Sequence, residues 1–144
     1  PSMGVSSVAR PFRFSSDGRA LIAMGDGKVR RWEVETGREL NSINLPTAKD
    51  FITALLSEEG RILAAANMES SAVRLWDTTA GRELQAITFE KEDRLNGQDS
   101  IALSPNGGVL AALTETVKAS RKNIETTIEL RLWDVASGRK TQSI

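Results

Sequence analysis

One stretch of sequence occurs three times along the chain, and this internal repeat limits the possible folds more than any other feature. Each copy has a Trp, a Gly five positions later, an Arg directly after this Gly, and an Ile eleven positions after the Trp. The Trp and Gly anchors are Trp32 with Gly37, Trp76 with Gly81, and Trp133 with Gly138. A Ser-x-x-Gly segment precedes each Trp, at Ser15, Ser57 and Ser104. Agreement at this many positions indicates three copies of one structural unit.

Each copy divides into four short strands with turn signals between them. In the second copy, the predicted strands are Phe51 to Leu56, Arg61 to Ala66, Ala72 to Asp77 and Glu83 to Phe89. The Gly of Ser-x-x-Gly supplies the positive φ that closes the first hairpin, and Thr79-Ala80-Gly81 closes the third. Apolar residues on both faces and Ala-rich second strands indicate sheets covered on both sides. The sequence therefore predicts an all-β chain of three four-stranded antiparallel sheets.

The spacing of the repeats also predicts an insertion in the third copy. The Trp residues are 44 and then 57 residues apart. The first value fits the period of about 40–45 residues that is typical of four-stranded units in a radial array. The excess lies between Leu113 and Ile128, which predicts one inserted surface loop over residues 114–127.

At these residues the sequence resembles the WD-repeat family of β-propellers, which is named for Trp-Asp at the end of the third strand. Trp76-Asp77 and Trp133-Asp134 match this pattern, whereas Trp32-Glu33 keeps only the charge. The family's Gly-His dipeptide is absent, because the chain has no His, and its Asp six residues before the Trp occurs once, as Asp26. The family's buried His–Asp network therefore cannot form here.

The resemblance covers about Val8 to Ile144 and implies one propeller blade for each copy. The blades are expected at about 8–45, 50–89 and 99–144, after an N-terminal extension at 1–7 that indicates processing or engineering. The residues expected to act as structural anchors of the repeat are Trp32, Trp76, Trp133, Asp77, Asp134, Gly37, Gly81 and Gly138.

Three blades do not make a ring, since propellers close with about four to eight. The outer faces of the first and third blades would expose apolar side chains, which favours coverage by further sheets. Two interpretations follow: a half-propeller whose copies associate into a six-bladed homodimer, or a fragment of a longer propeller. Arg31, at the position held by Leu75 and Leu132, marks the first blade as atypical, through repeat drift or a role at an interface.

Composition argues against several classes of function. Nineteen basic residues balance nineteen acidic ones, so no net charge attracts nucleic acid or an anionic membrane. The absence of Cys and His removes thiolate and imidazole chemistry, and we predict no catalytic, cofactor-binding or metal-binding residues. No apolar run approaches the roughly 18 residues that span a bilayer, and no signal-peptide pattern is visible, which favours the cytoplasm.

Binding residues are expected on long loops that a rigid scaffold displays. Lys118, Arg121 and Lys122 form a basic cluster in the predicted inserted loop and could dock an acidic peptide or a phosphate. Glu92, Asp93 and Arg94 form a second candidate in the connector from Glu90 to Asp99. Both clusters have the alternative interpretation of ordinary solvated loops.

The sequence thus favours a scaffold for protein–protein interactions, with a protein or peptide partner and no catalytic activity. The alternatives are a regulatory or sensor segment of a larger multidomain protein, an engineered fragment for propeller assembly, and, with least support, a propeller-type hydrolase or lyase.

Overall fold

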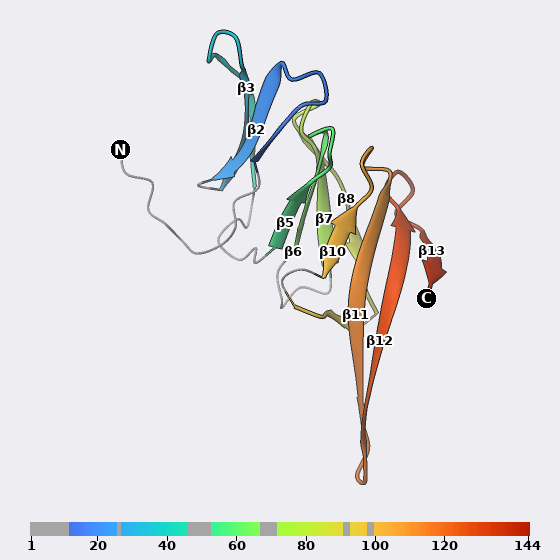
Figure 1. Cartoon of the computed structure of the whole chain (residues 1–144). Helices are drawn as coiled ribbons and strands as arrows, with labels where there is room; N and C mark the ends of the chain where they lie inside the picture. The colour runs from blue at the N-terminus through green and yellow to red at the C-terminus, as the bar shows by residue number, and fades with distance from the viewer. Residues whose placement is uncertain (1–11, 26, 46–52, 67–71, 91–92, 98–99) are drawn as a thin grey trace.

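The computed structural model describes residues 12–25, 27–45, 53–66, 72–90, 93–97 and 100–144. All regular elements in these ranges are strands, and they form three antiparallel sheets in chain order (Figure 1). The first sheet contains β1 (Phe12–Phe14), β2 (Ala20–Gly25), β3 (Lys28–Glu33) and β4 (Glu39–Asn44). The second contains β5 (Thr53–Leu56), β6 (Ile62–Ala66), β7 (Ala72–Asp77) and β8 (Arg82–Thr88). The third contains β10 (Ile101–Leu103), β11 (Val109–Ala119), β12 (Ile124–Asp134) and β13 (Lys140–Ser143), with β9 (Asp93–Leu95) pairing with β11.

The prediction of an all-β chain with three antiparallel sheets is confirmed, but the third sheet has five strands and not four, because β9 pairs with β11 although it lies before the predicted start of this unit at 99. Within the second sheet, β6, β7 and β8 lie within one residue of the predicted strands at each end. Strand β5 ends at Leu56 as predicted, and its predicted start at Phe51 lies outside the described residues. The extension at 1–7, Asp26 and Glu92 also lie outside them. The described part of the chain has no helix long and apolar enough to cross a bilayer.

The Ser-x-x-Gly turns are built in the same way in all three sheets. The glycine N–H donates to the serine carbonyl at 2.8 Å in each, and the glycines adopt φ of 69°, 69° and 72°. Each serine Oγ also accepts from the backbone N–H five residues later, at 2.9, 3.1 and 2.9 Å. The hydroxyl therefore fastens the start of the second strand to the turn, which explains why Ser recurs at this position.

The core consists of two apolar layers, one on each face of the second sheet. Trp76, 1% exposed, packs with Ile22 and Val29 of the first sheet. Trp133, 4% exposed, packs with Val73 and Leu75 of the second sheet. The small side chains of β6 lie at 0% exposure between these layers (Ala64, Ala65, Ala66). Each buried Trp therefore faces the preceding sheet, and the alanines let three sheets approach one another closely.

The same hydrogen bond joins both pairs of neighbouring sheets. Asn41 on β4, nine residues after Trp32, donates through Nδ2 to the carbonyl of Thr78 at 3.1 Å. Gln85 on β8, nine residues after Trp76, donates through Nε2 to the carbonyl of Val135. Thr78 and Val135 each lie two residues after the Trp of the next sheet. The two interfaces are therefore repeats of one packing arrangement.

Arg31 lies at the interface between the first two sheets. Its Nη1 donates to Thr79 Oγ1 on the second sheet at 2.8 Å. Of the two interpretations of Arg31, the contact favours a role at an interface.

The repeat spacing predicted that the insertion in the third copy is a surface loop. This prediction is wrong, because most of the inserted residues belong to two paired strands. Strands β11 and β12 each have eleven residues and pair without interruption from Val109 opposite Asp134 to Ala119 opposite Ile124. The residues beyond β9, β10 and β13 form a hairpin that projects from the sheet (Figure 1). The extra residues are rich in Thr, Val and Ile, whose branched side chains suit a paired strand.

Candidate functional site

The projecting hairpin, residues 117–128, is the first candidate binding surface; we call it the arm. Its turn is closed by the Ser120 N–H donating to the Asn123 carbonyl at 2.8 Å and the Asn123 N–H donating to Ser120 Oγ at 3.1 Å. Lys118, Arg121 and Lys122 are all exposed at this end of the arm. The fold thus brings together the basic cluster that the sequence singled out, with Lys118 on β11 and Arg121 and Lys122 in the turn that joins β11 to β12.

The two faces of the arm differ in character. Cross-strand partners share a face, so Val117 lies with Thr126, and Ala119 with Ile124. This face is apolar and open, with Ile124 at 72% exposure and Ile128 at 55%. On the opposite face Lys118 lies across from Glu125 in the register of the two strands.

The second candidate cluster is divided by the fold, with Asp93 buried, Arg94 exposed and Glu92 outside the described residues. The connector contains a strand, β9, and Asp93 on this strand is only 2% exposed. Arg94 is exposed and lies opposite Glu115 in the register of β9 with β11. Asp93 faces inward because Arg131, a buried cation on β12, requires a counterion there.

The ion pair between Asp93 and Arg131 is the centre of a buried polar network. Arg131 donates through Nη1 to Asp93 Oδ2 and through Nη2 to Asp93 Oδ1, the latter at 3.3 Å. The Thr116 hydroxyl also donates to Asp93, and Arg131 Nε donates to Glu129 at 3.0 Å. Burial by itself would raise the pKa of Asp93, but the hydrogen bonds from Arg131 and Thr116 lower the pKa below its ordinary value. The hydrogen bond to Asp93 likewise raises the pKa of Arg131, so both groups stay charged.

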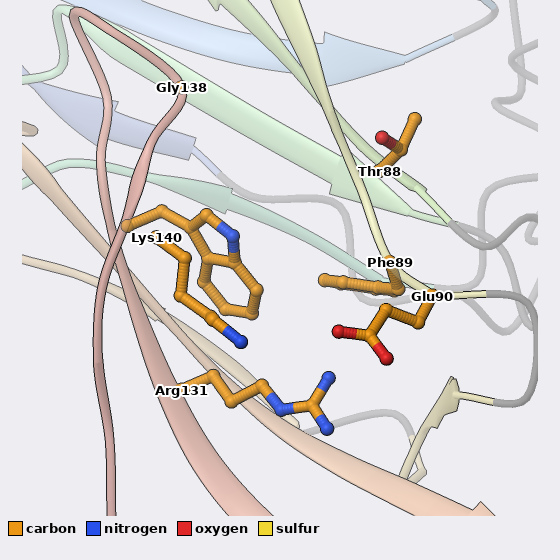
Figure 2. A pocket seen from close by; sticks show the side chains of 7 residues that line it. Thr88, Phe89, Glu90, Arg131, Gly138 and Lys140 are labelled. Atoms are coloured by element: carbon orange, nitrogen blue, oxygen red, sulfur yellow. The ribbon is translucent and has the colours of Figure 1, made fainter.

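Beside this network is a cleft of about 250 Å³ at the junction of the second and third sheets. Its lining residues are Thr88, Phe89, Glu90, Arg131, Trp133, Gly138 and Lys140. The rings of Phe89 and Trp133 meet at a centroid distance of 5.4 Å and an angle of 51°. The side chains of Glu90, Arg131 and Lys140 point toward the hollow beside Phe89 (Figure 2).

The cleft combines an aromatic wall with one carboxylate and two cations. Such a set can hold a charged or amphipathic side chain. Among the described residues, no three of the side chains that ligate metals lie close enough together to hold an ion.

The sequence interpretation missed Arg131, although a signal was present. An Arg stands two residues before the Trp in every copy: Arg30, Arg74 and Arg131. Arg74 lies 5.4 Å from the centroid of the Trp76 ring and pairs with Glu83 at 2.6 Å. This recurring cation accompanies the Trp on the face toward the preceding sheet.

The acidic residue directly after the Trp stabilises the turn between the third and fourth strands of its sheet. Asp77 Oδ1 accepts from the backbone N–H groups of Thr79 and Ala80, each at 2.9 Å. Asp134 Oδ1 accepts from the N–H of Ser137 at 2.8 Å and from its hydroxyl at 2.6 Å. These bonds from Ser137 lower the pKa of Asp134.

No described sheet packs against either of the two outer faces of the stack. On the first sheet, Phe14 pairs with Leu21 and Leu21 with Trp32, so these three side chains share the face that points away from the second sheet. Phe12 and Phe14 are 73% and 54% exposed there. On the third sheet, register places Leu130 and Leu132 on the outward face. The exposed apolar residues of this end are Val109, Ile128, Leu130 and Ile144.

These features define a class of protein, an all-β repeat protein of stacked antiparallel sheets with a projecting hairpin. No family model matches the chain, and no curated protein matches it. Among solved structures, the chain is similar to one described as Kuenenia stuttgartiensis hydrazine synthase, at 15% sequence identity and a TM-score of 0.44. The match covers 99% of this chain and 51% of that one, so this chain spans about half its length. A likeness at this level identifies neither family nor function.

Proposed function

We propose that this chain is a three-bladed segment of a WD-repeat-like β-propeller that works as a protein-interaction scaffold without catalytic activity. In this role its three sheets are blades, a second copy closes the ring to six blades, and the arm is displayed to a protein or peptide partner.

The observation that carries the proposal is the repeated inter-sheet interface. Each of the two interfaces has a Trp facing the preceding sheet and an amide that donates to the carbonyl two residues after the next Trp. Among the described residues, each end of the stack also presents one half of such an interface with no sheet packed against it. Trp32 and the exposed Val34 lie on the first sheet, and Gln142, equivalent to Asn41 and Gln85, lies on the last.

These two halves are complementary and not alike. A contact between them is therefore head-to-tail, and such contacts repeat until a ring closes. Two chains of three sheets would satisfy both ends at once in a closed ring with twofold symmetry. The buried apolar area at each joint would resemble that of the interfaces inside the chain.

The scaffold role is supported by the chemistry available. The chain has no His or Cys, and the cleft beside Trp133 offers a single carboxylate. A long hairpin on a stack of packed sheets instead provides exposed surface on a rigid support.

The proposal is tested by light scattering in solution. We expect a mass of about twice the 15.7 kDa of the chain. Phe14→Glu on the first sheet or Val109→Glu on the third places a charge in the joint and should give monomers. Ile124→Glu, a similar change at the end of the arm, should leave the mass doubled. A soluble wild-type monomer, or an equal effect of all three variants, would contradict ring closure.

A further inference from the structure

We propose that the cleft beside Trp133 binds a small zwitterion with an apolar body, of which a free apolar α-amino acid is the simplest example. This binding function goes beyond the protein scaffold proposed above. Both walls of the cleft belong to the second and third sheets, which pack against each other within the chain. The site therefore needs neither a second copy nor the arm.

The interface between the first and second sheets shows how the fold accommodates a cation beside a buried Trp. There Arg74 lies 5.4 Å from the centroid of the Trp76 ring. It donates to Glu83 through Nε at 2.8 Å and through Nη2 at 2.6 Å. The guanidinium of the chain thus covers the ring, and a carboxylate from the neighbouring strand compensates its charge.

At the next interface the position of Glu83 is held by Lys140. Glu83 lies opposite Trp76 in the register of the third and fourth strands, and Lys140 lies opposite Trp133 in the same way. The third sheet thus offers an ammonium group where the second sheet offers a carboxylate. An ammonium group cannot compensate a guanidinium, so Arg131 requires a different counterion.

Arg131 has this counterion in Asp93, and its Nε also donates to Glu129 at 3.0 Å. Two carboxylates of the protein therefore compensate its charge, and a ligand need not do so. The other charged side chains of the cleft are Glu90 and Lys140, both exposed. Neither of them makes an ion pair or a side-chain hydrogen bond with another described residue.

These two unpaired charges decide the charge of the ligand. Figure 2 shows that Glu90 and Lys140 both point toward the hollow beside Phe89. A simple anion would be repelled by Glu90, and a simple cation would be repelled by Lys140. A ligand with one charge of each sign compensates both side chains at once.

The aromatic wall and the size of the cleft decide the rest of the ligand. The rings of Phe89 and Trp133, whose centroids are 5.4 Å apart, favour contact with an apolar group. The cleft has a volume of about 250 Å³. Pockets for drug-sized molecules have roughly 300–1,000 Å³, so the ligand is smaller than these. An α-amino acid with an apolar side chain meets both conditions.

The test uses the whole protein labelled with ¹⁵N and follows the indole N–H signals of its three Trp residues by NMR while L-leucine is added. We expect a saturable shift of the Trp133 signal, with half-saturation at about 10 mM or below, and smaller shifts of the other two signals. The absence of a saturable shift at Trp133 would overturn the proposal.

Two analogues each remove one charge of the ligand. Leucinamide lacks the carboxylate, and N-acetyl-leucine lacks the ammonium group. Each should bind about tenfold more weakly than leucine, because it leaves one side chain of the cleft without a partner. If either analogue binds as well as leucine, the site recognises a single charge and the proposal is overturned.

Variants assign each ligand charge to its partner. Lys140→Gln should weaken leucine about tenfold and leave leucinamide unchanged, since that analogue has no carboxylate to lose. Glu90→Gln should weaken leucine and leave N-acetyl-leucine unchanged for the same reason. The matched control is Arg139→Gln, which removes an exposed cation that does not line the cleft and should bind leucine like the wild type. Equal weakening by Arg139→Gln and Lys140→Gln would overturn the assignment.

Light scattering on the same samples separates this proposal from ring closure. A doubled mass without leucine binding would contradict the amino-acid site and leave the ring intact. A monomer that binds leucine with the expected charge dependence would support the site and contradict only the ring.

Discussion

At the scale of single residues, the buried pair of Asp93 and Arg131 is the most consequential polar feature. Both side chains are nearly inaccessible, and Asp93 accepts from Arg131 twice and from Thr116. A pair of this kind contributes little over an apolar pair of equal volume, but removal of one partner leaves a charge buried without compensation. Through these contacts Asp93 connects β9 to both β11 and β12.

We expect substitutions at Asp93 and Arg131 to have strongly non-additive effects on stability. Asp93→Asn should lower the free energy of unfolding by about 3–5 kcal/mol, because the charge of Arg131 loses its counterion. Asp93→Asn combined with Arg131→Met should cost much less, since neither charge then remains. Urea denaturation of the single and double variants measures the difference. Additive losses would show that the pair is not coupled.

The pH dependence follows from the lowered pKa of Asp93. A carboxyl whose folded pKa lies below its unfolded value, near 3.9, stabilises the fold above that value. This contribution is lost as the pH falls through the folded pKa. The gap in stability between wild type and Asp93→Asn should therefore be constant near neutral pH and shrink below about pH 4. A gap that widens in acid would contradict the assignment.

At the scale of elements, the turn glycines show how each sheet meets the one before it. A Cβ on Gly107 would lie 2.5 Å from Ile62 Cγ1 and 2.8 Å from Ile62 Cβ on the second sheet. A Cβ on Gly60 would lie 2.8 Å from Ile22 Cδ1 on the first sheet. The equivalent Gly18 has no described neighbour within 4 Å of that position. The Ser-x-x-Gly turn is therefore a contact with the preceding sheet as well as a hairpin closure.

Gly18 and Gly107 provide a matched pair for measuring this contact. Both have φ near 70°, so an Ala substitution at either costs about 1–2 kcal/mol of backbone strain. Only Gly107→Ala must also displace Ile62, which should add roughly 1–3 kcal/mol. We expect Gly107→Ala to lower the free energy of unfolding clearly more than Gly18→Ala in urea titrations. Equal losses would mean that the sheets do not pack closely at this turn.

The sequence predicted the elements best where the repeat defined them. The strands of the second copy and the glycine turns follow from local patterns, and they are present as predicted. The arm was mistaken for a loop because the repeat spacing was given more weight than the branched residues that alternate through it. Strand β9 has three residues and no pattern of its own, since it forms by pairing with β11 and through the Asp93–Arg131 contact. The cleft beside Trp133 was missed because Phe89 and Arg131 come from different sheets.

At the scale of the whole molecule, the stack ends in two unlike apolar faces. Inside the stack, the Trp face of one sheet covers the Leu- and Val-rich face of the sheet before it, as Trp133 covers Val73 and Leu75. The outer faces carry Trp32, Phe12 and Phe14 at one end and Val109, Leu130 and Ile144 at the other. Stable monomers rarely leave large contiguous apolar surfaces exposed.

If copies join head-to-tail, unfolding is coupled to dissociation, and the midpoint temperature must rise with protein concentration. We expect this rise over a concentration range of about a hundredfold, followed by circular dichroism. Gln142→Ala removes the amide that would bond the next copy, so it should lower the midpoint in concentrated samples and have little effect in dilute samples, where both proteins are dissociated. Gln85→Ala removes the equivalent bond to the Val135 carbonyl within the chain and should lower the midpoint at every concentration. A wild-type midpoint that does not change with concentration would show that the two faces do not join.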